Sequence, residues 1–129
     1  MTAVRVISRI LILGRAAAGR PEVLGGGNRV MQNPPLTEVL WAGRPDFIYW
    51  HFGALAMSQL DGNWWKTWND PLREALLPRQ KRDGCETGSW DPDDAWGAEG
   101  GRVYATAINV LTLETPYRFS PMLQQERER

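Results

Sequence analysis

The feature that most constrains this chain is the spacing of its apolar residues, which recur every three or four positions in several separate stretches. This spacing gathers apolar side chains on one face of an α-helix, whereas a half-buried strand alternates every second residue. Clusters of Pro and Gly separate the stretches and mark where helices end. Helices are predicted over 2–13, 21–31, 46–60, 64–81 and 102–115. The sequence therefore predicts an all-α fold of helical hairpins.

Local signals refine the first three helices. Pro21 suits a first helical turn, although the run Gly25–Gly27 weakens the prediction there, because each Gly costs about 1 kcal/mol against Ala in a helix interior. Asp46 is a good N-cap for the helix that follows it. That helix is apolar on most of its sides, so we expect it to be buried on most sides.

Prolines shape the last two helices. Pro71 falls inside 64–81, and we expect a fresh helix capped by Asp70, with a kinked single helix as the alternative. Residues 36–45 and 83–101 are predicted to be loops. Pro116 is expected to end the last helix. The predicted buried face of that helix consists of Val103, Ala107, Val110 and Leu111, and Ile108 and Leu113 broaden it.

Composition limits the classes of function. Fifteen basic residues balance fifteen acidic ones, so the net charge is zero and no basic excess points to nucleic acid. A neutral chain also has little charge protection against self-association. Cys85 is the single cysteine, which excludes an internal disulfide. Arg5 and Arg9 interrupt the apolar stretch Val4–Leu13, which is too short to be a transmembrane segment and is better interpreted as an amphipathic helix.

A repeat-like pattern lies in the stretch LLPRQKRDGCETGSWDPDDAWGAEGGRVYATAINVLTLE, residues 76–114. Gln80 closes a helix, a glycine-rich loop ends in Gly88-Ser89-Trp90, and the next helix contains Thr106-Ala107. This pattern resembles the glutamine-and-tryptophan repeat of squalene and oxidosqualene cyclases. The upstream segment 46–69 resembles the preceding hairpin of bacterial squalene-cyclase-like proteins.

The resemblance covers residues 46–115 and implies the α/α-toroid fold of the terpenoid-cyclase and protein-prenyltransferase superfamily, in which helical hairpins stack around a ring. It implies structural roles for Gln80, Gly88 and Trp90, which would pin the connecting loop. Four or five helices are too few for a closed ring. We therefore expect a C-terminal fragment, with residues 1–119 as a partial toroid and 120–129 as a charged, frayed tail. Its partners would be the remaining helices of a longer chain or further copies in a homo-oligomer.

The resemblance also suggests a catalytic interpretation. Asp91, Asp93 and Asp94 spell the Asp-x-Asp-Asp motif of class II terpene cyclases, in which the middle Asp is the proton donor. The position differs, because aligning Thr106-Ala107 with the family places 102–105, which hold no acid, on that motif. The alternative is a solvated Asp-Pro turn. A second alternative is a cation site formed by the carboxylates of residues 83–99.

Other chemistries lack a matching pattern. The zinc prenyltransferases use Asp, Cys and a later His, whereas His51 precedes Cys85 here, so no metal site or other cofactor is expected. A buried, hydrogen-bonded role is predicted for His51.

Seven tryptophans, most of them between Trp50 and Trp96, indicate either an aromatic core or an aromatic cavity. The candidate ligand-binding residues of such a cavity are Trp50, His51, Trp65 and Tyr104. The leading hypothesis is a toroid-like protein that binds an apolar, terpenoid-like ligand or a polypeptide. A class II cyclase and a structural interaction scaffold are the alternatives.

Overall fold

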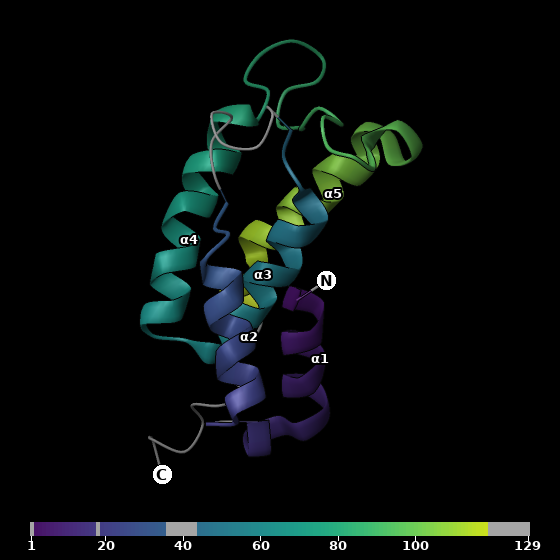
Figure 1. Cartoon of the computed structure of the whole chain (residues 1–129). Helices are drawn as coiled ribbons and strands as arrows, with labels where there is room; N and C mark the ends of the chain where they lie inside the picture. Colours follow the sequence, from purple (N-terminus) through teal and green to yellow (C-terminus); the bar gives the residue numbers. More distant parts are fainter. Residues whose placement is uncertain (1, 18, 36–43, 119–129) are drawn as a thin grey trace.

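The computed structural model describes residues 2–17, 19–35 and 44–118. Within these ranges the chain is all-α, as predicted, and forms no named strand (Figure 1). None of the described helices is long and apolar enough to cross a membrane. The elements are α1 (Thr2–Leu13), the 3-10 turn η1 (Gly14–Ala17), α2 (Pro21–Met31), α3 (Phe47–Leu60), α4 (Asn63–Leu76), the 3-10 turn η2 (Leu77–Arg79) and α5 (Gly97–Arg118).

Helix α3 is the centre of the structure. It packs against α1, α4 and α5 and also touches α2 (Figure 1). Asp46 caps its first turn as predicted, because the Asp46 carboxylate accepts a hydrogen bond from the backbone N–H of Tyr49 at 2.9 Å. Phe47, Trp50 and Met57 are buried. The expectation that this helix is enclosed on most sides is confirmed.

Two glycine positions allow helices to approach closely. Trp68 of α4 packs directly against α3 at Gly53, where an added Cβ would lie 2.1 Å from the indole. In α2, Gly26 faces Val6 of α1, and a Cβ there would lie 2.6 Å from a Val6 methyl. Gly26, one of the three glycines that weaken the helix prediction, thus has a packing role, since a larger residue there would separate α1 from α2.

Two expectations about proline are wrong. Helix α4 runs without interruption through Pro71, so Asp70 does not start a fresh helix. Trp68 and Leu72, on either side of Pro71, are buried on the same side of α4, and this shared packing keeps the two halves in one helix. Helix α5 likewise continues past Pro116 to Arg118.

The sequence predicts that the last helix starts at Arg102. The helix begins at Gly97, but Gly101 is non-helical (φ 64°, ψ −166°) and divides off the first turn. The long regular part therefore starts at Arg102, close to the prediction. The 83–101 loop is correspondingly shorter than predicted.

Most of the predicted buried face of α5 is exposed, and of its six residues only Ile108 and Leu113 pack against the core. Val103 is 84% exposed, and Ala107, Val110 and Leu111 are exposed as well. The opposite face packs towards the core, and its buried residues are Ala105, Asn109, Thr112 and Thr115. Periodicity distinguished two faces of α5, but α3 packs against the more polar of the two.

The toroid arrangement stays a prediction, since the described helices establish the all-α class alone. Most of the loop predicted at 36–45 and the tail predicted at 120–129 lie outside the described residues.

The packing at Gly53 gives the first testable prediction. We expect Gly53→Ala to lower the free energy of unfolding by about 1–3 kcal/mol, because the methyl group overpacks against Trp68. Gly25→Ala should raise it by up to about 1 kcal/mol, because Gly25 lies in a helix with open space at its Cβ. Urea unfolding measures both. Equal effects of the two substitutions would contradict the packing.

Candidate functional site

Residues 80–91 form a closed loop, here called the clasp, within the connection between α4 and α5. Gln80 and Trp90 pair as an isolated antiparallel bridge. The Gln80 side-chain amide donates to the Gly88 carbonyl at 2.9 Å, and the Lys81 backbone N–H donates to the Ser89 carbonyl at 2.9 Å. The structure therefore brings the three predicted repeat residues together at one place.

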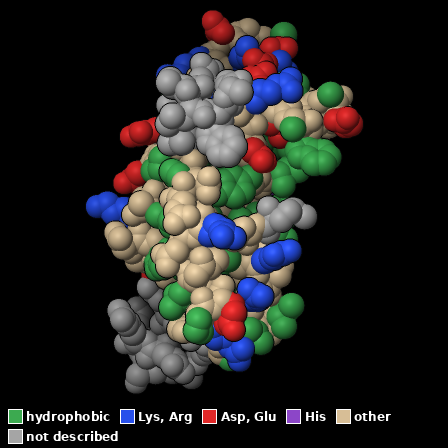
Figure 2. Space-filling model, in the orientation of Figure 1, with side chains coloured by type: hydrophobic (Ala, Val, Ile, Leu, Met, Phe, Trp, Pro, Cys, Tyr) green, Lys and Arg blue, Asp and Glu red, His purple; other side chains and the backbone are tan. Residues whose placement is uncertain are grey.

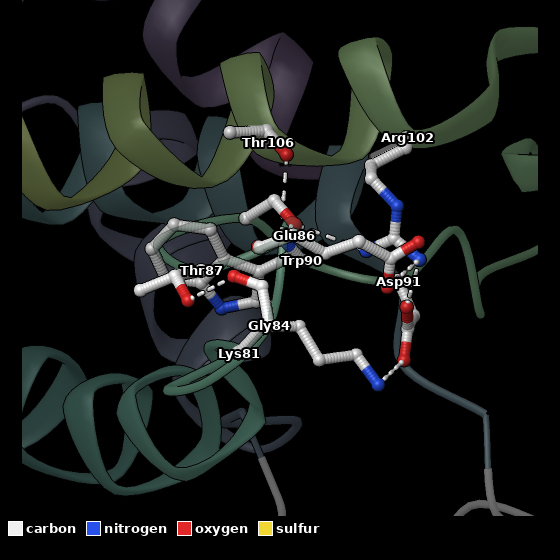
Figure 3. Close-up of polar contacts among 9 residues, drawn as sticks. Lys81, Gly84, Glu86, Thr87, Trp90, Asp91, Arg102 and Thr106 are labelled. Carbon is white, nitrogen blue, oxygen red and sulfur yellow. Dashed lines mark hydrogen bonds and ion pairs between the residues drawn. The ribbon is translucent and has the colours of Figure 1, made fainter.

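Trp90 fastens the clasp to both helices. Its buried indole N–H donates to the Leu76 carbonyl at the end of α4 at 2.9 Å. Its backbone N–H donates to the Thr106 hydroxyl of α5 at 3.2 Å (Figure 3). These two hydrogen bonds thus fix the position of α5 relative to the clasp and to the end of α4.

Ion pairs close the outer side of the clasp. Arg102 of α5 contacts the carboxylates of Asp91 and, at 3.1 Å, Glu86, and it donates to the Ser89 hydroxyl at 3.0 Å. Lys81 contacts the other oxygen of Asp91 at 2.8 Å (Figure 3). Hydrogen bonds from Lys81 and then Arg102 hold the pKa of Asp91 below its ordinary value. An acid held ionised in this way is poorly suited to donate a proton.

The other two predicted catalytic acids have separate surroundings. Asp93 is exposed, whereas Asp94 is buried and accepts a hydrogen bond from the Tyr104 hydroxyl at 2.7 Å. The second oxygen of Asp94 has no hydrogen-bond partner among the described residues. Burial, and then the bond to Asp94, raises the pKa of Tyr104 well above its ordinary value. The three acids of the motif therefore do not share one partner.

The acidic loop also does not assemble a recognisable metal centre. Across the described residues, no three His, Cys, Asp or Glu side chains are placed to share a metal ion. Cys85 is an exposed free thiol.

His51 is half-buried and hydrogen-bonded, as predicted. Its Nδ1 lies 3.1 Å from the Thr112 hydroxyl of α5, and that hydroxyl donates its one proton to the Ile108 carbonyl at 2.6 Å. Thr112 must therefore accept from His51, which assigns the neutral Nδ1–H tautomer. Burial lowers the pKa of His51, which favours this neutral form. His51 thus ties α3 to α5.

The predicted aromatic ligand-binding residues are distributed over three helices. Trp50 of α3 is buried edge-on against Phe47, with ring centres 5.9 Å apart. Trp65 of α4 is half-buried, and Tyr104 of α5 is occupied with Asp94. A groove between α1 and α2 and another beside Arg73 and Leu77 are lined by none of these residues.

Sequence reasoning missed the outward surface of α5 and the role of Arg102. Periodicity identified the apolar face of α5 but could not show that it lies away from α3. No local pattern marks Arg102 as the residue that closes the clasp.

Comparison of the chain with protein-family models, with characterised proteins and with solved structures found no match.

The indole bond of Trp90 leads to a second prediction. Trp90→Phe removes the N–H that reaches Leu76, so the free energy of unfolding should fall by about 1–3 kcal/mol. Trp96→Phe is the matched control, because Trp96 is 56% exposed and its replacement should change stability by no more than about 0.5 kcal/mol. Urea unfolding followed by circular dichroism compares them. Equal stability of the two variants would contradict an anchoring role for Trp90.

Asp91 gives a prediction about pH. Its lowered pKa means that its ion pairs stabilise the fold fully above the ordinary Asp pKa of about 4, and that this contribution fades as the pH falls through the lower folded-state pKa. Asp91→Asn should thus be less stable than the parent near neutral pH, and the difference should vanish in acid. Added salt should shrink it, because solvent reaches the side chains of Lys81 and Asp91, which are 38% and 32% exposed.

The exposed Asp93 supplies the control, since Asp93→Asn leaves the ion pairs of Asp91 in place and should have nearly the stability of the parent near neutral pH. Unfolding in urea at a series of pH values tests both variants. A difference for Asp91→Asn that grows as the pH falls would contradict the assigned ion pairs.

Proposed function

We propose that this chain is a helical scaffold that binds a polypeptide, and that this polypeptide is a second copy of the chain packed along α5. The observation that carries the proposal is the exposed apolar face of α5. Its members, here called the α5 stripe, are Val103, Ala107, Val110, Leu111 and Tyr117.

The spacing of the stripe suits helix pairing. Four stripe residues, Val103, Ala107, Val110 and Tyr117, together with Glu114 follow one another at intervals of four and three residues, which is the spacing of the seam between two packed helices. Glu114 is the charged member, and it already pairs with Arg118 one turn later at 3.2 Å. The apolar members would therefore lose water without burying an unpaired charge.

A second copy fits this surface for electrostatic reasons. No charged residue occurs from Val103 to Leu113, so two copies of α5 can meet over this segment without placing like charges together. The interface of a two-fold dimer must be complementary to itself, and a uniform apolar stripe meets that condition. The net charge of zero adds no general repulsion between copies.

The resemblance to α/α-toroid proteins is consistent with this proposal. In such folds each hairpin is covered by the next one, so a partial ring would leave an apolar helix face uncovered. The tryptophans that could have formed a ligand cavity are largely packed, with Trp50 and Trp68 buried in the core. The exposure of Asp93, the middle acid that would donate the proton, likewise weighs against the cyclase alternative. Binding of a polypeptide is therefore favoured over binding or conversion of a terpenoid.

The test is the oligomeric state of the whole chain. We expect sedimentation equilibrium to show a dimer that dissociates on dilution, and Val110→Lys to shift the chain towards monomer by placing a charge at the centre of the stripe. Leu24→Lys on α2 is the matched control, because Leu24 and Val110 are 37% and 39% exposed. The control should dimerise like the parent. A parent chain that stays monomeric at high concentration, or a Leu24→Lys that dissociates equally, would overturn the proposal.

A further inference from the structure

The groove between α1 and α2 has a volume of about 350 Å³ and gathers charged side chains from both helices. Helix α1 contributes Arg5 and Arg9, and α2 contributes Glu22 and Arg29. Arg5 and Arg9 are one turn apart on α1, so they share one face of that helix. Glu22, Gly25 and Arg29 follow one another at intervals of three and four residues, so they share one face of α2. The two faces border the same groove, which therefore presents three guanidinium groups and one carboxylate.

Two glycines of α2 shape the groove. A Cβ at Gly26 would lie 2.6 Å from a methyl group of Val6, so the helices touch at this point of the lining. A Cβ at Gly25 would meet no atom within 4 Å, so the space beside Gly25 is open. The volume of about 350 Å³ is near the lower end of the range for sites that hold small molecules. The shape therefore suits a compact ligand.

The three arginines of the groove are available to such a ligand. Arg5, Arg9 and Arg29 are exposed, and none of them forms an ion pair with another described residue. The cations beside the clasp differ, because Lys81 and Arg102 are both paired with Asp91. A guanidinium group presents a planar fork of N–H donors that matches the oxygens of phosphate. The groove therefore has the donors that a phosphate ligand requires.

The charge of the groove also matches phosphate. Three arginines and Glu22 give a net charge of +2, and a phosphate monoester carries about −1.5 to −2 at neutral pH. The positive charge extends beyond the groove, since residues 1–35 hold five basic residues and one acidic residue, whereas residues 36–129 hold ten and fourteen. Basic side chains are visible over α1 and α2 (Figures 1 and 2). A small anion would therefore be drawn towards this part of the chain.

We propose that the groove between α1 and α2 binds the phosphate group of a small soluble molecule, with Arg5, Arg9 and Arg29 as its donors. A lipid is disfavoured because Val6, the one hydrophobic side chain of the lining, is buried. A nucleic acid is disfavoured because it requires a basic surface that follows many phosphates, whereas this groove is a single small site. The groove shares no residue with the α5 stripe, so the inference does not depend on the proposed dimer.

A titration of the whole chain with inorganic phosphate tests the inference. The NMR signals of the arginine Nε–H groups are followed at constant ionic strength, which chloride maintains. We expect the signals of Arg5, Arg9 and Arg29 to shift together and to saturate, while that of Arg73, an exposed arginine of α4, stays in place. Glycerol 3-phosphate should saturate the same signals if the natural ligand is a phosphate monoester. A response to inorganic phosphate alone would assign the site to the free ion, and either result supports a phosphate site.

Three variants test the roles of charge and shape. Arg5→Gln should weaken phosphate binding by about tenfold, because it removes a charged donor. Glu22→Gln should strengthen binding several-fold, because it removes the one negative charge of the lining. Gly25→Leu should abolish binding although every charge remains, because its side chain would enter the open space beside Gly25.

Matched controls separate this site from general effects. Arg73→Gln removes an exposed arginine outside the groove, and Asn28→Leu places a leucine at an exposed position of α2 that does not line the groove. Both should bind phosphate like the parent. Val110→Lys should do so as well, so a failure of the proposed dimer is distinguishable from a failure of this inference. Circular dichroism verifies that every variant is folded, as expected for changes at exposed positions.

Three results would overturn the inference. The first is a set of arginine signals that do not saturate with phosphate, or that shift equally at Arg73. The second is binding by Gly25→Leu that equals binding by the parent, because the groove would then not hold the ligand. The third is binding only to vesicles that contain phosphatidylserine or only to RNA, with no response to either soluble phosphate, because this would assign the arginines to a macromolecular surface.

Discussion

The structure depends on the burial of α3, a helix that carries no Asp, Glu, Lys or Arg and is apolar on nearly all sides. Such a helix is stable only when neighbours remove it from water, and α1, α4 and α5 do so. Gly53 lets the Trp68 indole lie against its backbone, and His51 reaches Thr112 across the contact with α5. The other helices are positioned by their packing against α3. Their outward faces are therefore the surfaces available to bind a partner.

The clasp determines which face of α5 is exposed. The Trp90 backbone N–H donates a hydrogen bond to Thr106, and Asp91 forms an ion pair with Arg102. Two positions one turn apart on α5 are therefore bonded to the clasp. With these fixed, Ala105 and Thr112 turn towards α3 and Val103 turns away. The inward face even includes Asn109, whose buried amide has no hydrogen-bond partner among the described residues. Helix α5 buries Asn109, Thr112 and Thr115 while Val103 and Val110 are exposed, and such an exposed apolar surface is what a binding role of α5 requires.

Helix existence could be predicted from the sequence, whereas the environment of each face could not. The periodicity of 2–13 and 21–31 and the cap at Asp46 are local signals, and all three are confirmed. Pro71 and Pro116 were misjudged because tertiary packing of flanking residues such as Leu72 and Thr115 outweighs the local preference. The prediction of which α5 face is buried was wrong because periodicity identifies an apolar face but does not show which face packs against another helix. The clasp residues were found through a resemblance, but the ion pairs of Arg102 depend on folded geometry that no local pattern encodes.

The most direct test of the central claim, that the outward face of α5 binds another copy, is the concentration dependence of methyl and amide NMR shifts of the whole chain. The account predicts that signals of Val103, Ala107 and Val110 move on dilution, while those of Ala105 and Thr112, on the buried face, move far less. Shifts that do not depend on concentration would contradict the account. So would changes confined to residues outside α5, because they would place any self-association on a different surface.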